Sequence, residues 1–211
     1  MVAYDALKKA IIVGDEKEVE GQVNKALGKG AKAQDILVNG LIAGMEVVGQ
    51  RFKAGEMFLP EVLLSAEVMH KGLDIINPQL AQSGHKGLGT VVIGTVEGDI
   101  HDIGKRIVSF LLEGTGFEVI DLGVDVKTET FVQAVEKHNA KILGMSALLT
   151  TTMPNMAKTI DSLKERGLRD KVKIVVGGAP LSEQFAQSIG ADGYAPEAGS
   201  AVELVKRLVA S

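Results

Sequence analysis

The 211-residue sequence predicts an α/β chain in two parts: an N-terminal four-helix bundle, followed by a doubly wound parallel sheet of five strands. Three observations lead to this prediction. About the first eighty residues place apolar side chains at helical spacing. The pattern changes near residue 85, within a polar stretch rich in glycine. Beyond it, short apolar runs of strand length alternate with amphipathic segments of helical length.

Four segments of the N-terminal part are expected to be helices, the first over about residues 3–13. Pro60 suits the first turn of the fourth helix, and Asn77-Pro78 is expected to end it. Short connections favour antiparallel neighbours and therefore a four-helix bundle. The apolar stripes of the second, third and fourth segments are Val19, Val23, Ala26 and Leu27; Leu37, Leu41, Met45, Val48 and Phe52; and Leu63, Ala66, Met69, Leu73 and Ile76.

Three glycines, Gly40, Gly44 and Gly49, lie inside the third predicted helix. Each glycine in a helix interior costs about 1 kcal/mol relative to alanine. That cost is tolerated where a neighbour packs too closely for a side chain. We therefore expect close packing at these positions.

Residues 77–89, NPQLAQSGHKGLG, are rich in glycine and polar residues and show no apolar periodicity. Such a stretch is typical of a linker. The predicted domains are therefore a helical domain at residues 1–84 and an α/β domain at residues 88–211.

Five strands are expected after the linker. Helical segments between them predict right-handed βαβ units on a parallel sheet buried on both faces, a fold of the flavodoxin-like or Rossmann-like kind. In such sheets ligands bind beyond the carboxyl ends of the strands, at the switch point of the topology, and His101 and Gly177-Gly178 lie at such strand ends. The predicted strands are residues 90–95, 118–123, 141–147, 173–178 and, more weakly, 192–196, before a last helix at 197–210.

Composition excludes several classes of function. The chain is 45% hydrophobic and 24% charged, as expected of a soluble protein with a real core. Its 23 Lys and Arg against 27 Asp and Glu give a net charge of −4 with no basic tract, which argues against a nucleic-acid partner. No apolar run approaches the roughly 20 residues that span a bilayer, and the N-terminus becomes charged too soon for a signal peptide. A cytoplasmic protein without a membrane partner is expected.

The sequence contains no cysteine. This excludes disulfides, thiolate zinc sites, iron–sulfur ligation and cysteine nucleophiles. Any metal would have to be held by histidine, by carboxylates or by a prosthetic group. The aromatic content of 4%, with no tryptophan, also argues against stacking of nucleic-acid bases.

Asp99 and His101 lie in a short acidic turn after the first predicted strand, and Gly104 follows before the next helix. With one residue between them, both side chains can point the same way, so that the carboxylate accepts a hydrogen bond from one ring nitrogen while the other nitrogen faces a ligand. Metal sites use this arrangement, and Gly104 would let a bulky group approach the backbone. From this turn alone, a solvated loop in which Asp99 caps a helix explains the residues equally well.

Two other predicted strand ends carry small or hydroxyl residues. Ser146, Leu148 and the threonines at 150–152 follow the third strand, and Gly177-Gly178 ends the fourth. Taken singly, the hydroxyls could cap a helix and the glycines could form a tight turn.

Together, these stretches resemble the cobalamin-binding domain of the B12-dependent methyltransferases and mutases. In that family Asp-x-His-x-x-Gly, Ser-x-Leu and Gly-Gly follow the first, third and fourth strands; here they occupy residues 99–104, 146–148 and 177–178. Residues 55–69, GEMFLPEVLLSAEVM, are similar to the cap module of cobalamin-dependent methionine synthase and of the corrinoid proteins of anaerobic methyltransferase systems. The resemblance covers nearly the whole chain.

The resemblance implies a cobalamin cofactor bound in the base-off, His-on state. His101 would replace the cofactor's own base as the lower ligand of cobalt, and Asp99 would hold or pass the accompanying proton. Thr152, where methionine synthase has a serine, would end this relay. The other implied cofactor contacts are Asp102, Ile103, Gly104 and Thr150.

The displaced nucleotide tail would lie in a deep slot beside the sheet, where small residues leave room for it. Ser146 would offer its hydroxyl to the benzimidazole nitrogen. The residues implied for the slot are Gly94, Ser146, Leu148, Gly177 and Gly178.

The helical domain would act as a cap over the upper, methyl-bearing face of the corrin, because an apolar lid keeps water from a reactive cobalt–carbon bond. A place in the core of the bundle is the plainer interpretation for any one of the implied residues. Since the lid must move to admit a partner, residues 82–89 would be a hinge. The implied lid residues are Met57, Phe58, Leu59, Val62 and Leu63.

By the same resemblance, the chain is a non-autonomous corrinoid subunit that carries a methyl group on cobalt. It would accept the group from a methylated amine, methanol, betaine or aryl ether on a substrate-specific methyltransferase. It would yield the group to a second methyltransferase that acts on tetrahydrofolate or on a thiol such as coenzyme M. A reductive activase would be a further partner.

Other functions fit parts of the pattern. A B12-dependent sensor or regulator would use the same two domains, but the sequence shows neither a basic recognition helix nor spare chain for a DNA-binding segment. A mutase small subunit would lack the cap stretch at residues 57–60. A flavodoxin-like domain without a corrin would bind no cobalt.

Overall fold

The computed structural model describes residues 4–82 and 87–210. The chain divides into two compact units. One holds the N-terminal helices and residues 110–116, and the other holds residues 88–109 and the chain from residue 117 onward. Residues 83–86, at the centre of the predicted hinge, lie outside the described residues, so the hinge and the domain boundary stay predictions.

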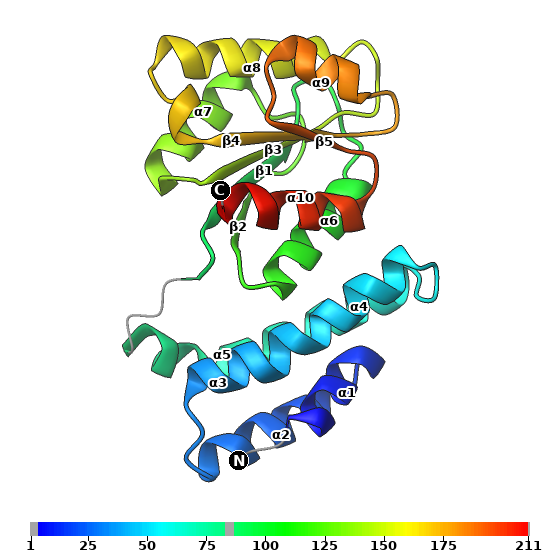
Figure 1. The fold of residues 1–211 in the computed structure, drawn as a ribbon, viewed down its shortest axis with the longest axis vertical. Helices are drawn as coiled ribbons and strands as arrows, with labels where there is room; N and C mark the ends of the chain where they lie inside the picture. The colour runs from blue at the N-terminus through cyan, green and yellow to red at the C-terminus, as the bar shows by residue number, and fades with distance from the viewer. Residues whose placement is uncertain (1–3, 83–86, 211) are drawn as a thin grey trace. The chain divides into compact units, whose positions relative to one another are not determined.

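The N-terminal unit is helical (Figure 1), and each of the four helical segments among its described residues buries an apolar face. The third segment is continuous but changes from α to π geometry and back. Asp15 caps the second helix by accepting a hydrogen bond from the Glu18 N–H at 3.0 Å. The segments are α1 (Asp5–Val13), α2 (Glu16–Gly28), α3 (Ala33–Ile36) with η1 (Leu37–Ile42) and α4 (Ala43–Lys53), and α5 (Leu59–Gln82). The predicted four-helix bundle is confirmed.

Close packing explains two of the three glycines in the third segment. A Cβ at Gly40 would lie 2.5 Å from Leu7 Cδ2, and one at Gly44 would lie 2.9 Å from Ile11 Cβ. Helix α1 therefore approaches the backbone of the third segment, as predicted. At Gly49 a Cβ would meet nothing closer than 3.8 Å, so the prediction is wrong there.

The prediction that Asn77-Pro78 ends the fourth helix is also wrong, because α5 continues through Pro78 to Gln82. Proline removes one backbone donor and crowds the preceding turn, at a cost of about 3 kcal/mol, but its own φ is helical. Leu80 is only 8% exposed and extends the buried stripe of Met69 and Ile76 by another turn. Burial of a leucine contributes about 1.5–3 kcal/mol, which offsets most of the cost.

The second unit contains a five-stranded parallel sheet in the order β2-β1-β3-β4-β5. This is the flavodoxin-like order, with its switch point between the adjacent strands β1 and β3. The strands are β1 (Thr90–Thr95), β2 (Glu118–Asp121), β3 (Ile142–Ser146), β4 (Lys173–Gly177) and β5 (Gly193–Ala195). All five lie within the predicted runs, so the predicted fold class is confirmed.

Helices cover both faces of the sheet: α6 and α10 lie on one face, and α7, α8 and α9 lie on the other (Figure 1). Residues alternate between the faces along each strand. Val92, Leu143 and Ile174 belong to the core that also contains Phe131 of α7 and Ile160 of α8. The helices are α6 (Ile103–Gly114), α7 (Thr128–His138), α8 (Pro154–Glu165), the short 3₁₀ turn η2 (Arg169–Lys171), α9 (Glu183–Ile189) and α10 (Ala198–Ala210).

The opposite face presents small and hydroxyl side chains at its carboxyl edge. Thr95, Ser146, Gly177 and Ala195 are register partners across β1, β3, β4 and β5. They therefore form a row on the face that α6 and α10 cover. This row lies beside the loops that carry the predicted site.

We expect Gly44→Ala to lower the free energy of unfolding by about 1 kcal/mol. Overpacking against the β-branched Ile11 costs about 1–3 kcal/mol, which exceeds the gain of about 1 kcal/mol in helix propensity. The control is Gly21→Ala in α2, where a Cβ meets nothing within 4 Å and the propensity gain should stabilise the protein. Urea unfolding followed by circular dichroism measures both; equal stabilisation by the two variants would contradict the close packing.

Candidate functional site

The candidate site lies at the carboxyl ends of β1 and β3, where the order of the sheet changes direction. The loop after β1 carries Asp99 and His101, and the loop after β3 carries Leu148, Leu149 and Thr152. Because the two strands are parallel neighbours, both loops leave the same edge of the sheet. The structure thus brings the first two predicted stretches together.

Asp99 is fully buried, and one of its carboxylate oxygens holds His101. Oδ1 accepts a hydrogen bond from the His101 backbone N–H at 3.0 Å and lies 2.8 Å from the imidazole Nδ1. With Nδ1 donating to the carboxylate, Nε2 keeps a lone pair for a metal. The His101 side chain is 46% exposed, so the ring is accessible from outside the sheet.

The other carboxylate oxygen of Asp99 holds the loop after β3. Oδ2 accepts hydrogen bonds from the backbone N–H groups of Leu148 at 2.8 Å and Leu149 at 3.1 Å. The Thr152 hydroxyl lies 2.9 Å from the same oxygen and 2.8 Å from the Leu149 carbonyl oxygen. A hydroxyl has one proton, so Thr152 donates to one of these two acceptors at a time. The expected proximity of Asp99, His101 and Thr152 is present; their part in a proton relay stays a prediction.

These contacts keep Asp99 ionised. Burial alone would raise the pKa of its carboxyl group, because it penalises the charged form. The hydrogen bonds from His101, Leu148 and Thr152 outweigh burial and hold the pKa of Asp99 well below its ordinary value. At neutral pH a negative charge therefore fixes the orientation of the imidazole.

A third loop, which follows β2, braces the same turn. Asp125 adopts a left-handed backbone conformation with φ of 52°, donates its N–H to the Asp99 carbonyl at 2.9 Å and accepts the Gly98 N–H on its carboxylate at 2.7 Å. The buried Lys105 at the start of α6 pairs with Asp121 at the end of β2. Asp125 was not among the predicted site residues; aspartate is among the few residues that tolerate this conformation, but its partners are distant in sequence.

A hydroxyl contact joins the strands beneath the two main loops. Thr95 Oγ1 donates to the His101 carbonyl oxygen at 3.2 Å and lies 2.8 Å from Ser146 Oγ. Thr95 is fully buried, whereas Ser146 is partly exposed. The sequence analysis identified Ser146 but not Thr95, although both residues end their strands.

The structural constraint that favours glycine differs among the predicted glycine positions. Gly178 has φ of 138°, and a Cβ there would lie 1.8 Å from the Ala147 carbonyl oxygen, so two backbones meet at this point. A Cβ at Gly104 would meet nothing within 4 Å, which leaves open surface beside His101. Gly94 belongs to the opposite face, where a Cβ would lie 2.7 Å from Phe131. Packing against α7 therefore explains Gly94, and its place in a tail slot stays a prediction without support from this packing.

Large apolar side chains are exposed in the three loops and at the start of α6. Such exposure is unfavourable in water and marks a surface that an apolar partner covers. An accessible imidazole among apolar side chains fits a corrin, which offers a metal and a broad apolar ring. Asp102 is partly buried at the start of α6, and Thr150 is exposed in the loop after β3. The exposed side chains are Ile100, Ile103, Val124, Leu148 and Leu149.

The implied lid residues of the helical unit divide into two groups. Met57 and Val62 are buried, at 6% and 0% exposure, so the core interpretation applies to them. Phe58 is 68% exposed, and Leu59 and Leu63 are partly exposed. Only this second group can present apolar surface to a ligand.

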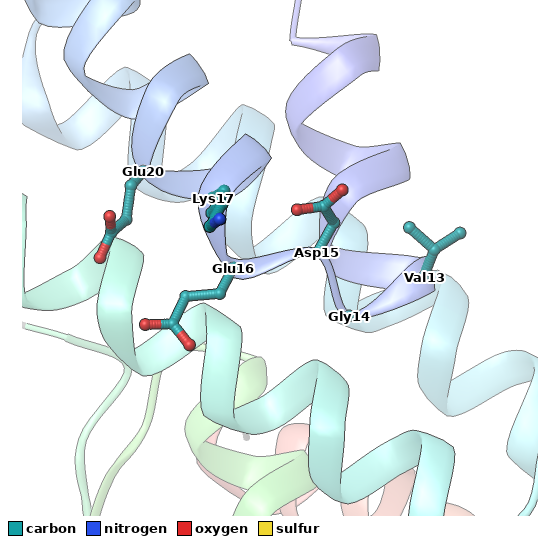
Figure 2. Close-up of a pocket in the computed structure, with 6 residues that line it drawn as sticks. All are labelled: Val13, Gly14, Asp15, Glu16, Lys17 and Glu20. Carbon is teal, nitrogen blue, oxygen red and sulfur yellow. The ribbon is translucent and has the colours of Figure 1, made fainter.

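A recess in the helical unit lies at the turn between α1 and α2 and is lined by residues 13–17 and Glu20 (Figure 2). Asp15 caps α2, and Glu16 pairs with Lys71 at 3.6 Å, so these charges already have partners within the unit. None of the predicted site residues lines this recess.

Within residues 4–82 and 87–210, no group of three or more His, Asp and Glu side chains is arranged to hold a metal ion. No helix there is both long and apolar enough to cross a membrane.

The family models agree with the fold and the site. A model described as a B12 binding domain matches residues 89–205, and a second model with the same description matches residues 3–77. The class is therefore that of B12-binding proteins, and the cofactor is a cobalamin-type corrinoid.

Relatives define the group within this class. A corrinoid protein of Desulfitobacterium hafniense (strain Y51) is 48% identical over 99% of this chain and 98% of its own. The trimethylamine corrinoid protein of Methanosarcina barkeri is 47% identical over 94% and 93%. The methanol:cobalamin methyltransferase complex of Methanosarcina barkeri contains a chain 35% identical, with a TM-score of 0.88, over 98% of this chain and 79% of that one. The chain belongs to the corrinoid proteins of methyltransferase systems.

We expect Asp99→Asn to destabilise the protein by about 2–4 kcal/mol at pH 7, because an amide cannot accept all the donors that the carboxylate satisfies. The folded state favours ionised Asp99, so its contribution is complete above the ordinary aspartate pKa of about 3.9 and is lost as the pH falls below it. The gap between wild type and variant in urea unfolding should therefore shrink from pH 7 to pH 3. The exposed Glu165→Gln is the control; a gap that is constant with pH would contradict the role of the charge.

Proposed function

We propose that the protein binds cobalamin base-off and His-on and carries a methyl group on cobalt between two methyltransferases. The observation that carries this proposal is the pair of Asp99 and His101. The buried carboxylate holds Nδ1 at 2.8 Å and leaves Nε2 of a half-exposed ring as the free donor atom. A histidine that served only to cap or fill the loop would not need a buried, ionised partner.

The bound corrinoid would supply a cobalt centre that accepts and yields a methyl group, and this chemistry belongs to the cofactor. His101 would hold the metal through Nε2. The exposed side chains of Ile100, Ile103 and Leu148 would cover the apolar ring. Gly104, with open space around it, would let the ring approach the start of α6.

The residues around His101 also manage its proton. If Nε2 were free of a metal and carried a proton, Asp99 Oδ1 would stabilise the resulting cation through its contact with Nδ1. Asp99 Oδ2 keeps its donors from the loop after β3 throughout. The single proton of Thr152 can move between Asp99 Oδ2 and the Leu149 carbonyl. Thr152 thus retains the hydroxyl that the proposed relay needs.

The nucleotide tail of the cofactor would lie along the row of small residues on the face that α6 and α10 cover. Ser146 is partly exposed and has a hydroxyl proton to offer to a base nitrogen. Gly177 adds no side chain to the row, and Gly178 permits the close approach of the two loops. Within the helical unit, Phe58, Leu59 and Leu63 would form the lid surface.

The partners we propose are a substrate-specific methyltransferase, a second methyltransferase and a reductive activase, in the cytoplasm. The trimethylamine corrinoid protein at 47% identity and a dimethylamine corrinoid protein of Methanosarcina barkeri at 46% favour a methylated amine as the methyl donor. The methanol complex supports direct docking on a methyltransferase.

Reconstitution with methylcobalamin tests the binding mode. The wild type should show the visible spectrum of base-off cobalamin, and His101→Ala should retain less corrinoid and show an altered spectrum. His138→Ala is the matched control, because His138 ends α7 near the amino ends of the strands. Base-on absorbance in the wild type, or an unchanged spectrum in His101→Ala, would contradict the proposal.

The carrier role has its own test. Protein reduced with titanium(III) should be methylated again only when a methylamine methyltransferase and its methylated amine are both present. Cobalt remethylation is followed by visible absorbance. Remethylation by the amine without an enzyme, or none with any of a panel of methyltransferases, would count against a carrier.

Gly104→Val separates binding from folding. A Cβ at this exposed position meets nothing within 4 Å, so the free energy of unfolding should change by less than about 0.5 kcal/mol. The same side chain would occupy the surface proposed for the corrin, so methylcobalamin affinity should fall at least about tenfold, or 1.4 kcal/mol. Equilibrium binding followed by absorbance measures the affinity, and urea unfolding measures the stability. Undiminished affinity would exclude Gly104 from the contact surface.

A further inference from the structure

The hydroxyl of Thr95 links the two halves of the candidate site. Thr95 ends β1 and pairs in parallel register with Ser146, which ends β3. Its Oγ1 donates to the His101 carbonyl oxygen at 3.2 Å and lies 2.8 Å from Ser146 Oγ. One buried oxygen therefore touches both the loop of the proposed cobalt ligand and the residue proposed to meet the nucleotide tail.

The hydroxyls of Thr95 and Ser146 and the carbonyl of His101 can form hydrogen bonds in two arrangements. A hydroxyl has one proton, whereas a carbonyl oxygen can only accept. If Thr95 donates to the His101 carbonyl, Ser146 must donate to Thr95 for their 2.8 Å contact to be a hydrogen bond. If Thr95 donates to Ser146 instead, the carbonyl loses the Thr95 proton and the Ser146 proton is available to another acceptor.

Because Thr95 is buried, its hydroxyl can form hydrogen bonds only with these protein partners. Thr95 has no exposed surface, so water cannot supply a missing partner to its hydroxyl. Ser146 is partly exposed, so a ligand atom at the edge of the sheet can reach it. Without such a ligand the first arrangement makes more hydrogen bonds within the protein, since both hydroxyl protons are then donated to protein oxygens.

We propose that Thr95 is a positioning residue that couples occupancy of the tail pocket to the His101 loop. This inference rests on the proposed base-off, His-on mode. A base nitrogen that takes the Ser146 proton leaves the Ser146 oxygen facing Thr95 at hydrogen-bond distance, which draws the Thr95 proton toward Ser146. The His101 carbonyl is then released, and the loop that carries the imidazole loses one of its anchors. A corrinoid without a nucleotide tail leaves the anchor in place.

The His101 carbonyl can be observed by itself. His101-Asp102 is the only His-Asp pair in the sequence, so carbonyl-¹³C histidine with ¹⁵N aspartate gives one correlated NMR signal from this peptide bond. The carbonyl carbon moves upfield when it loses a hydrogen bond. The probes are aquacobalamin, which has a tail, and diaquacobinamide, which lacks one; both contain diamagnetic cobalt(III).

In the full-length wild type, we expect the carbonyl signal to lie upfield with aquacobalamin relative to diaquacobinamide. Thr95→Val keeps the shape but removes the hydroxyl, so the signal should be upfield with both probes and in the free protein. In Ser146→Ala, the His101 carbonyl is the remaining acceptor for the Thr95 proton. The carbonyl signal should therefore stay downfield with both probes. Thr95→Ser restores the hydroxyl and should behave like the wild type. If Thr95→Val does not fold, the coupling is still tested by comparing the wild type, whose carbonyl signal should differ between the probes, with Ser146→Ala, whose signal should not.

A second readout separates this inference from the proposed function. Cobalt(II) cobinamide bound to protein labelled with ¹⁵N histidine should show each cobalt line in its EPR spectrum split into a doublet by the axial nitrogen. Absence of the doublet would overturn the His-on mode and the coupling with it. A doublet together with the same wild-type carbonyl shift for both probes would overturn the coupling alone.

Discussion

The buried carboxylate of Asp99 is the interaction on which the site depends. One oxygen holds the backbone and imidazole of His101, and the other holds the loop after β3 through Leu148, Leu149 and Thr152. A buried charge without partners would be too costly to keep. With its donors in place, the same charge fixes the imidazole and ties two loops together. Loss of any one donor therefore disturbs both loops.

Sheet topology makes this arrangement possible. Adjacent parallel strands deliver their carboxyl ends to one edge, so β1 and β3 present their loops side by side. The loop after β2 adds a brace through Asp125 and Gly98. Since the loops are short and anchored on strand ends, the imidazole is preorganised before any cofactor arrives. Preorganisation limits the entropy lost on binding.

The two units of the chain differ in what their residues contribute to the site. Both B12-binding models match, yet the residues that hold His101 all lie in the α/β unit. In the helical unit, Met57 and Val62 serve its own core, whereas Phe58 is exposed. The helical unit therefore has its own buried core and presents an exposed apolar side chain at Phe58.

The sequence by itself determined the helices, the strands and the pairing of Asp99 with His101, because periodicity and a spacing of two residues depend on neighbours along the chain. It failed at Pro78, where burial further along the helix outweighed a local signal, and at Gly49, where no neighbour packs closely enough to exclude a side chain. Only the tertiary structure decided that Thr95 meets Ser146, 51 positions away. Strand order brings such residues together, and no local pattern contains the strand order.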